Sequence, residues 1–200
     1  MKLYSQLGQD ETVFNYYNKL KTGYFVEVGA FDGVSFSNTF ALEQVGWKGV
    51  CVEPLPCRFS ELVKNRSCKA YNVAAYQVSG KVLDFVIADS PMLSGDVTRI
   101  DVSRVSNLNN RISVPTMNLT EILDDAHAPS FIEFLSLDTE GSELDVLKGI
   151  DFKKYAFGYM TVEHNFLEPA RTNIRNFLAE NGYEVKCENK CDDDYVLKNK

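Results

Sequence analysis

The sequence lacks a long hydrophobic run and an excess of positive charge. No apolar run approaches the roughly 20 residues that a membrane-spanning helix needs, and residues 1–6 lack the apolar core of a signal peptide. Lys and Arg number 21 against 28 Asp and Glu, a formal net charge of -7. Nucleic acids are bound mainly through clustered Lys and Arg. We therefore expect no nucleic-acid partner, no membrane span and a cytoplasmic location.

Cysteine and histidine are also scarce. Five cysteines, an odd number, do not make a disulfide framework, and Cys51 lies in an apolar run where a buried free thiol is ordinary. Cys187 and Cys191 have metal-like spacing, but the chain has only two histidines to complete a four-ligand zinc site. We therefore expect a fold without disulfides or structural zinc.

The composition, 44% apolar and 24% charged, is that of a globular domain. No repeat or linker divides the chain, so we expect one domain over residues 1–200, and residues 1–21 are expected to be a helical segment that covers the site. The compact length is also compatible with a domain excised from a larger multidomain protein.

Short apolar runs alternate with helical patterns, which is typical of a parallel sheet covered by helices. The expected strands are 24–28, 49–53, 70–73, 131–137, 159–162, 183–186 and 195–197. No helix separates the last two, so they are expected to pair antiparallel. The sequence thus predicts an α/β fold with a doubly wound sheet, which binds ligands beyond the carboxyl ends of its strands.

Residues 88–110 form the longest stretch without a clear period. Long loops in compact domains often bind ligands, so this stretch is a candidate for substrate contact, with a solvated loop as the alternative.

Small and acidic residues follow the first three expected strands. Gly29 and Gly33 form a turn that allows close approach of a ligand. Glu53 ends the second strand 24 residues after Gly29, where a carboxylate can accept both ribose hydroxyls of an adenosine cofactor. Residues 72–75 are suited to an adenine ring. The turn is not G-x-G-x-x-G, so a nicotinamide dinucleotide is only weakly indicated.

Ionisable residues also follow the next two strands. Asp138 and Glu140 follow the fourth, and Glu163 and His164 end the fifth. Such groups at adjacent strand ends point into one crevice, as in an active site. His164 has the ordinary pKa nearest neutrality, although a structural role is an equal alternative. The carboxylates could accept a proton, hold sugar hydroxyls or hold Mg²⁺, and the sequence leaves the metal question open.

Eight segments, spread over nearly the whole chain, carry a family resemblance: 5–10 (SQLGQD), 25–33 (FVEVGAFDG), 37–39 (SNT), 46–49 (GWKG), 52–54 (VEP), 65–66 (NR), 135–143 (LSLDTEGSE) and 162–165 (VEHN). In this order they resemble the FkbM-type family of S-adenosylmethionine (SAM)-dependent methyltransferases. The resemblance implies a Rossmann-like class I fold with a seven-stranded, mostly parallel sheet, helices on both faces and a C-terminal antiparallel edge pair.

The resemblance also implies roles for individual residues. The cofactor-binding set is Gln9, Glu27, Gly29, Asp32, Gly33, Ser37, Asn38, Glu53, Asn72, Ala74, Ala75 and Asp138. Within it, Glu53 would hold the ribose, residues 72–75 the adenine, and the group from Glu27 to Asn38 the methionine end. Gln6, Gln9 and Asp10 would fold over the site, with simple helix capping as the equal alternative. The catalytic candidates are Asp138, Glu140, Glu163 and His164.

The function favoured by the resemblance is SAM-dependent O-methylation of a hydroxyl, most simply on a sugar or glycan. A small lipid or polyketide hydroxyl is an alternative acceptor. One rival function is a Rossmann-type NAD-dependent oxidoreductase, which would have a fuller glycine turn. Another is a binding module that keeps the fold without catalysis, and such a module would lose the carboxylates at the strand ends.

Overall fold

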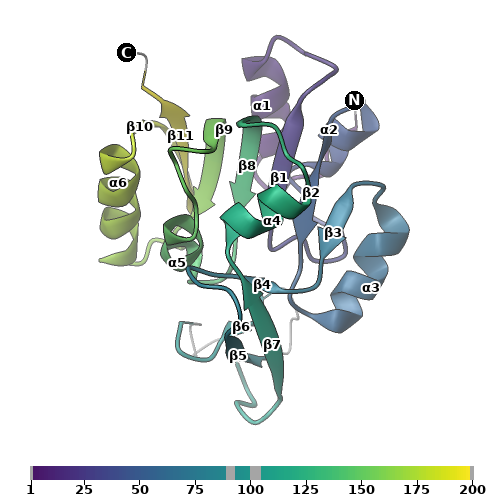
Figure 1. Cartoon of the computed structure of the whole chain (residues 1–200), viewed down its shortest axis with the longest axis vertical. Coiled ribbons are helices and arrows are strands. Elements are labelled where there is room, and N and C mark those ends of the chain that lie inside the picture. Colours follow the sequence, from purple (N-terminus) through teal and green to yellow (C-terminus); the bar gives the residue numbers. More distant parts are fainter. Residues whose placement is uncertain (1, 89–92, 100–104, 199–200) are drawn as a thin grey trace.

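The computed structural model describes residues 2–88, 93–99 and 105–198, so the polar stretch 88–110 lies partly outside the described residues. Within them, seven strands form a central sheet in the order β10-β11-β9-β8-β1-β2-β3 (Figure 1). Their bounds are β1 (Tyr24–Val28), β2 (Lys48–Val52), β3 (Lys69–Tyr71), β8 (Phe131–Leu137), β9 (Ala156–Glu163), β10 (Tyr183–Asn189) and β11 (Asp192–Leu197). Only the pairings of β11 with β9 and β10 are antiparallel. The predicted sheet and its antiparallel edge pair are confirmed.

Helices cover both faces of this sheet. One face packs against α1 (Gln9–Tyr16), α2 (Phe40–Gln44) and α3 (Pro56–Asn65), and the other against α4 (Leu119–Asp125), α5 (Glu143–Lys148) and α6 (Ala170–Glu180). Phe25 and Cys51 belong to the first core, whereas Val26 and Val50 belong to the second, because successive side chains of a strand point to opposite faces. No helix among the described residues is both long and apolar enough to cross a membrane.

Local signals set the start of α4. The side chain of Asn118 accepts a hydrogen bond from the backbone N–H of Glu121 at 2.8 Å, and its Nδ2 donates to Oε1 of Glu121 at 2.8 Å. The first of these bonds caps the helix, because it gives a partner to a backbone N–H of the first turn.

A second, smaller sheet was not predicted. Its strands, in the order β4-β7-β5-β6, are β4 (Ala74–Ala75), β7 (Arg111–Met117), β5 (Val82–Val86) and β6 (Gly95–Asp96). Val82 and Arg111 are exposed, whereas Phe85 and Val114 pack in a small core with Leu55. The small sheet lies beyond the carboxyl ends of the central strands (Figure 1). It therefore forms a wall opposite the place where a doubly wound sheet binds its ligand.

Candidate active site

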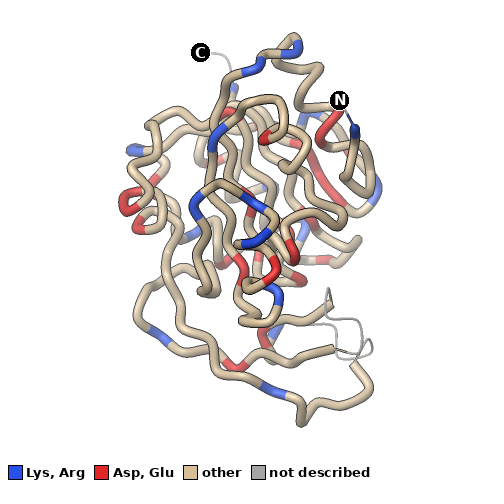
Figure 2. Tube along the Cα trace, turned by 90° about the vertical axis from the view of Figure 1, so that its right-hand side faces the viewer, with Lys and Arg blue, Asp and Glu red and all other residues tan. Residues whose placement is uncertain are grey.

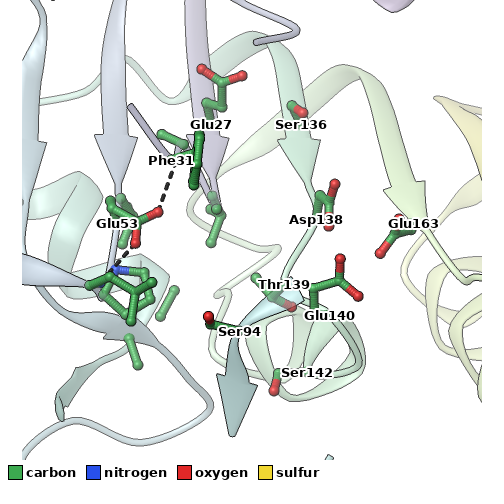
Figure 3. A pocket seen from close by; sticks show the side chains of 18 of the residues that line it. Glu27, Phe31, Glu53, Ser94, Ser136, Asp138, Thr139, Glu140, Ser142 and Glu163 are labelled. Carbon is green, nitrogen blue, oxygen red and sulfur yellow. Dashed lines mark hydrogen bonds between the residues drawn. The ribbon is translucent and has the colours of Figure 1, made fainter. Parts of the chain in front are cut away.

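A cavity of about 280 Å³ lies between the carboxyl ends of the central strands and the small sheet (Figure 3). The central sheet and its loops contribute polar groups, among them Glu27, Ser37, Asn38, Glu53, Asp138, Glu140 and Glu163. The small sheet contributes apolar groups, among them Ala74, Ala75, Leu83 and Phe85. The cavity thus has a polar side and an apolar side, and most of the predicted site residues line it.

Gly29 allows the end of β1 to lie against the end of β8. Its φ is +84°, and a Cβ at this position would overlap the carbonyl oxygen of Asp138. Gly33, at φ +81°, lies against the side chain of Arg66, with 2.7 Å between a Cβ and Cγ of Arg66. Side chains with a Cβ rarely adopt this conformation. Gly29 lines the cavity, whereas Gly33 lies outside its lining.

Glu53 is fixed at one edge of the cavity by the backbone. Its Oε2 accepts from the N–H of Phe31 and its Oε1 from the N–H of Leu55, each at 2.8 Å (Figure 3). The residue is 4% exposed, and this burial raises the pKa of its carboxyl to about 7. Asn72 supports the same turn by donating to the carbonyl oxygen of Glu53 at 2.9 Å, and it does not line the cavity.

Both carboxylate oxygens of Glu27 accept hydrogen bonds from other residues of the protein. Its Oε1 accepts from the backbone N–H of Asn38 at 2.8 Å, and its Oε2 accepts from Oγ1 of Thr39 at 2.7 Å and from Arg66 at 3.0 Å. The hydroxyl of Ser37 donates to both oxygens at 2.9 Å. Glu27 therefore holds the loop that begins at Ser37, and Arg66 balances its charge.

The carboxylate of Asp32 is hydrogen-bonded within its own turn. Its carboxylate accepts from the N–H groups of Val34 at 2.9 Å and Ser35 at 2.7 Å. Together with the Ser35 hydroxyl, these donors hold the pKa of Asp32 below its usual value although partial burial opposes the shift. The residue is not part of the cavity lining, so the structure does not place Asp32 where the resemblance implies.

Asp138, Glu140 and Glu163 lie close together on the side of the cavity opposite Glu53 (Figure 3). Burial raises the pKa of Glu163 strongly, and the neighbouring charges of Asp138 and Glu140 raise it further. Enclosure in the cavity also raises the pKa of Asp138. None of the described residues that line the cavity is Lys or Arg. Figure 2 shows acidic positions gathered at this end of the central sheet, where they face the small sheet.

His164 is turned away from the cavity. Its Nδ1 accepts from the backbone N–H of Phe166 at 2.9 Å, and its Nε2 lies 3.6 Å from Oδ1 of Asp193. Burial lowers the pKa of its imidazole. Because His164 is outside the cavity lining, the structure supports its structural alternative rather than the role of base.

The N-terminal segment closes a side of the site. Gln6 lines the cavity, and Gln9 lines a smaller adjoining hollow of about 50 Å³, where its Nε2 donates to Oδ2 of Asp192 at 2.7 Å. Asp10 is used locally, since it accepts from the N–H of Tyr4 at 2.8 Å. The helix in the expected segment 1–21 spans α1 alone.

Sequence reasoning named Ala74 and Ala75 of β4 but missed the cavity residues of β5. Leu83 and Phe85 lie on one face of β5, and this alternation was the signal that could have identified them. Ser136, whose hydroxyl accepts from Nδ2 of Asn38 at 2.9 Å, was also missed because it lies inside an apolar strand.

Two groups of acidic residues lie close enough together to be tested as Mg²⁺ sites. Among the described residues, ligand atoms of Asp138, Glu143 and Glu163 lie within 4.8 Å of one another, as do those of Glu163, Cys191 and Asp192. Oε1 of Glu143 already accepts from the N–H groups of Thr139 at 2.9 Å and Gly141 at 3.1 Å. The second group includes a thiol, which Mg²⁺ disfavours. The structure thus gives no support for Mg²⁺ at either group.

Solved structures with the same fold are methyltransferases of low sequence identity. One is a proposed RNA methyltransferase from Pyrococcus horikoshii, with a TM-score of 0.51 and 10% identity over 96% of this chain and 83% of that one. Another is a TehB-like SAM-dependent methyltransferase from Corynebacterium glutamicum, with a TM-score of 0.51 and 8% identity over 98% and 89%. At this identity the likeness concerns the fold alone.

The sequence itself matches one protein family. A search of curated proteins finds no match. Residues 27–185, which include the end of β1, the turn after β8 and the end of β9, match the family described as methyltransferase FkbM domain. The chain therefore belongs to the FkbM methyltransferase family and has the fold of SAM-dependent methyltransferases, as its motifs indicated.

Proposed function

We propose that the protein transfers the methyl group of SAM to a hydroxyl of a sugar or glycan, as a single domain over residues 1–200 in the cytoplasm. The observation that supports the acceptor class is the combination of carboxylates and an exposed aromatic ring in the cavity lining. Phe36, which lines the cavity, is 51% exposed. A sugar has hydroxyls for the carboxylates and an apolar C–H face for the ring.

The residues of the cavity fit SAM. Glu53 can accept hydrogen bonds from the two ribose hydroxyls, and Ala74, Ala75, Leu83 and Phe85 provide a small apolar wall for the adenine. Bound SAM supplies a methyl group on a positively charged sulfur. The acidic opposite side suits that charge, because no described cation lines the cavity.

Glu140 is our candidate for the base that removes the hydroxyl proton. It lines the cavity on the turn after β8 and adopts a left-handed φ of +54°. Bulky side chains in this conformation are concentrated at functional sites. A hydroxyl is a poor nucleophile until its proton leaves, and a placed carboxylate can accept that proton. The remaining task of the protein is to align the two reacting atoms.

The acidic chain and its cavity also argue against nucleic acid as the acceptor, since phosphates would meet carboxylates rather than Lys or Arg. A lipid or polyketide hydroxyl is less suited, because its apolar body would desolvate Glu140 and Glu163.

The test is methyl transfer from radiolabelled SAM to methyl glycosides of glucose, mannose, rhamnose and fucose. We expect transfer to at least one glycoside. We expect Glu140→Gln to lower kcat by about 10²- to 10⁴-fold, while affinity for S-adenosylhomocysteine (SAH) in calorimetry changes much less than kcat. The matched control is Glu184→Gln, on exposed β10. Transfer to RNA or a lipid hydroxyl but to no sugar would refute the acceptor class, and full kcat in Glu140→Gln would refute the base.

A further inference from the structure

The carboxylates that the resemblance places at the methionine end of SAM are not available to it. Glu27 accepts from Ser37, Asn38, Thr39 and Arg66, and Asp32 accepts from its own turn. The α-ammonium group of methionine has three donors and no acceptor. A different set of acceptors must therefore receive it.

Asp138 and Glu163 have the required position. β8 is two strands away from β2, and neighbouring strands lie about 4.8 Å apart, so Glu53 and Asp138 end strands that are separated by roughly 10 Å. The skeleton of SAH spans a similar distance from its ribose hydroxyls to its ammonium group. With the ribose at Glu53, the amino-acid end reaches the acidic side of the cavity.

The adjoining hollow of about 50 Å³ adds acceptors at this point. Asp138, Glu163 and Asn38 line both the cavity and the hollow. Oδ1 of Asn38 is buried and accepts no hydrogen bond from the described residues, although Nδ2 of the same side chain donates to Ser136. A buried polar atom without a partner is costly and points to a missing donor.

We propose that Asp138 and Glu163, together with Oδ1 of Asn38, bind the α-ammonium group of SAM. This inference rests on the proposed use of SAM but not on the identity of the acceptor. It assigns Asp138 to the cofactor rather than to catalysis, makes Glu163 a cofactor-binding residue, and leaves the proton of the acceptor to Glu140.

The proposal has a consequence for protons. Six groups face the pair. They are Glu140 and Glu143 after β8, Asn165 after β9, Gln9 of α1, Cys191 in the turn between β10 and β11, and Asp192 at the start of β11. None of them is a cation, and burial together with neighbouring charges raises the pKa values of both carboxyls, so the pair without the ammonium group holds a proton to higher pH than free carboxylates do. The incoming ammonium favours the doubly ionised pair, and the displaced proton passes to solvent. Affinity for the cofactor should therefore rise with pH.

The experiment compares two ligands by calorimetry at pH 7 in buffers of different ionisation enthalpy. SAH carries the amino-acid group, and 5′-deoxy-5′-methylthioadenosine keeps the adenosine and the sulfur without it. Proton release that both ligands cause belongs to Glu53, and the additional release with SAH belongs to the pair. Each ligand is titrated into the wild type, Glu163→Gln, Asp138→Asn and the control Glu184→Gln.

We expect Glu163→Gln to weaken SAH by about ten- to a hundredfold, the effect of losing a charged hydrogen-bond partner, and to abolish the additional proton release. Affinity for methylthioadenosine should stay within about twofold, and Asp138→Asn should behave similarly. Equal losses for both ligands, or no additional proton release in the wild type, would overturn the proposal. Failure of both ligands to bind the wild type would refute the use of SAM itself.

Discussion

Glu27 at β1 and Glu163 at β9 are both buried acidic residues in the same sheet, but their surroundings are opposite. Glu27 is paired with Arg66 and three further donors, whereas Glu163 faces Asp138 and Glu140. A buried carboxylate is tolerated when a positive charge is paired with it. Without such a partner, burial raises the pKa of the carboxyl group. The difference indicates that Glu27 maintains the fold, whereas Glu163 is suited to bind a positively charged ligand.

Arg66 donates hydrogen bonds to several acceptors around Glu27. Besides Glu27 it forms an ion pair with Glu43, and it donates to Oγ1 of Thr39 at 2.8 Å and to the carbonyl of Gly33 at 3.1 Å. These bonds tie α2, α3 and the loop after β1 together. This network is satisfied internally, as buried polar groups usually are.

The largest effect is expected from Arg66→Met, which removes the ion pairs of Arg66 with Glu27 and Glu43. We expect a loss of about 3 to 5 kcal/mol in the free energy of unfolding, because Glu27 and Glu43 would remain buried without a counter-charge. Urea denaturation at pH 7 measures the loss. Arg58→Met is the control, because the pair of Arg58 with Glu61 is partly exposed and should contribute less than about 1 kcal/mol. Similar losses for both variants would contradict the structural role of Arg66.

An intermediate effect is expected from Glu53→Gln. Glu53 has backbone N–H donors but forms no ion pair with a described residue, so its surroundings are intermediate between those of Glu27 and Glu163. We expect affinity for methylthioadenosine to fall by about 1 to 3 kcal/mol at pH 8, because a charged acceptor for the ribose is lost. The pKa of Glu53 is about 7, so wild-type affinity should fall as the pH drops from 8 to 6, while the variant should show no such dependence. Calorimetry at both pH values measures this. A wild-type affinity independent of pH would remove Glu53 from the ribose site.

The smallest effect is expected on the stability of the unliganded protein when Glu163 becomes Gln. The folded pKa of Glu163 is above its unfolded value, so its favourable contribution is present below the unfolded pKa and lost as the pH rises. Glu163→Gln should therefore stabilise the protein by about 0.5 to 2 kcal/mol at pH 8, with a smaller gain at pH 5. Urea denaturation at the two pH values, with Glu184→Gln alongside, measures the gain. Destabilisation at pH 8 would show that Glu163 is structural.

Much of the central sheet could be predicted because its signals are local. The strands at 24–28 and 131–137 have the predicted bounds. The small sheet was missed because β5 and β7 expose much of their surface, which weakens the apolar pattern. Its pairing of residues 82–86 with 111–115 is also distant along the chain.

For the site, the sequence by itself determined which residues follow the central strands, because strand ends can be read from apolar runs and glycines. Only the tertiary structure decided which of them face the cavity. His164 ends the same strand as Glu163, yet its backbone N–H bonds the carbonyl of Cys191 at 2.8 Å and its ring turns toward Asp193. Arg66, 39 residues after Glu27, neutralises that carboxylate, while no described cation reaches Glu163. The direction of a side chain and the charge beside it depend on partners far away in the sequence, and these come together only when the chain folds.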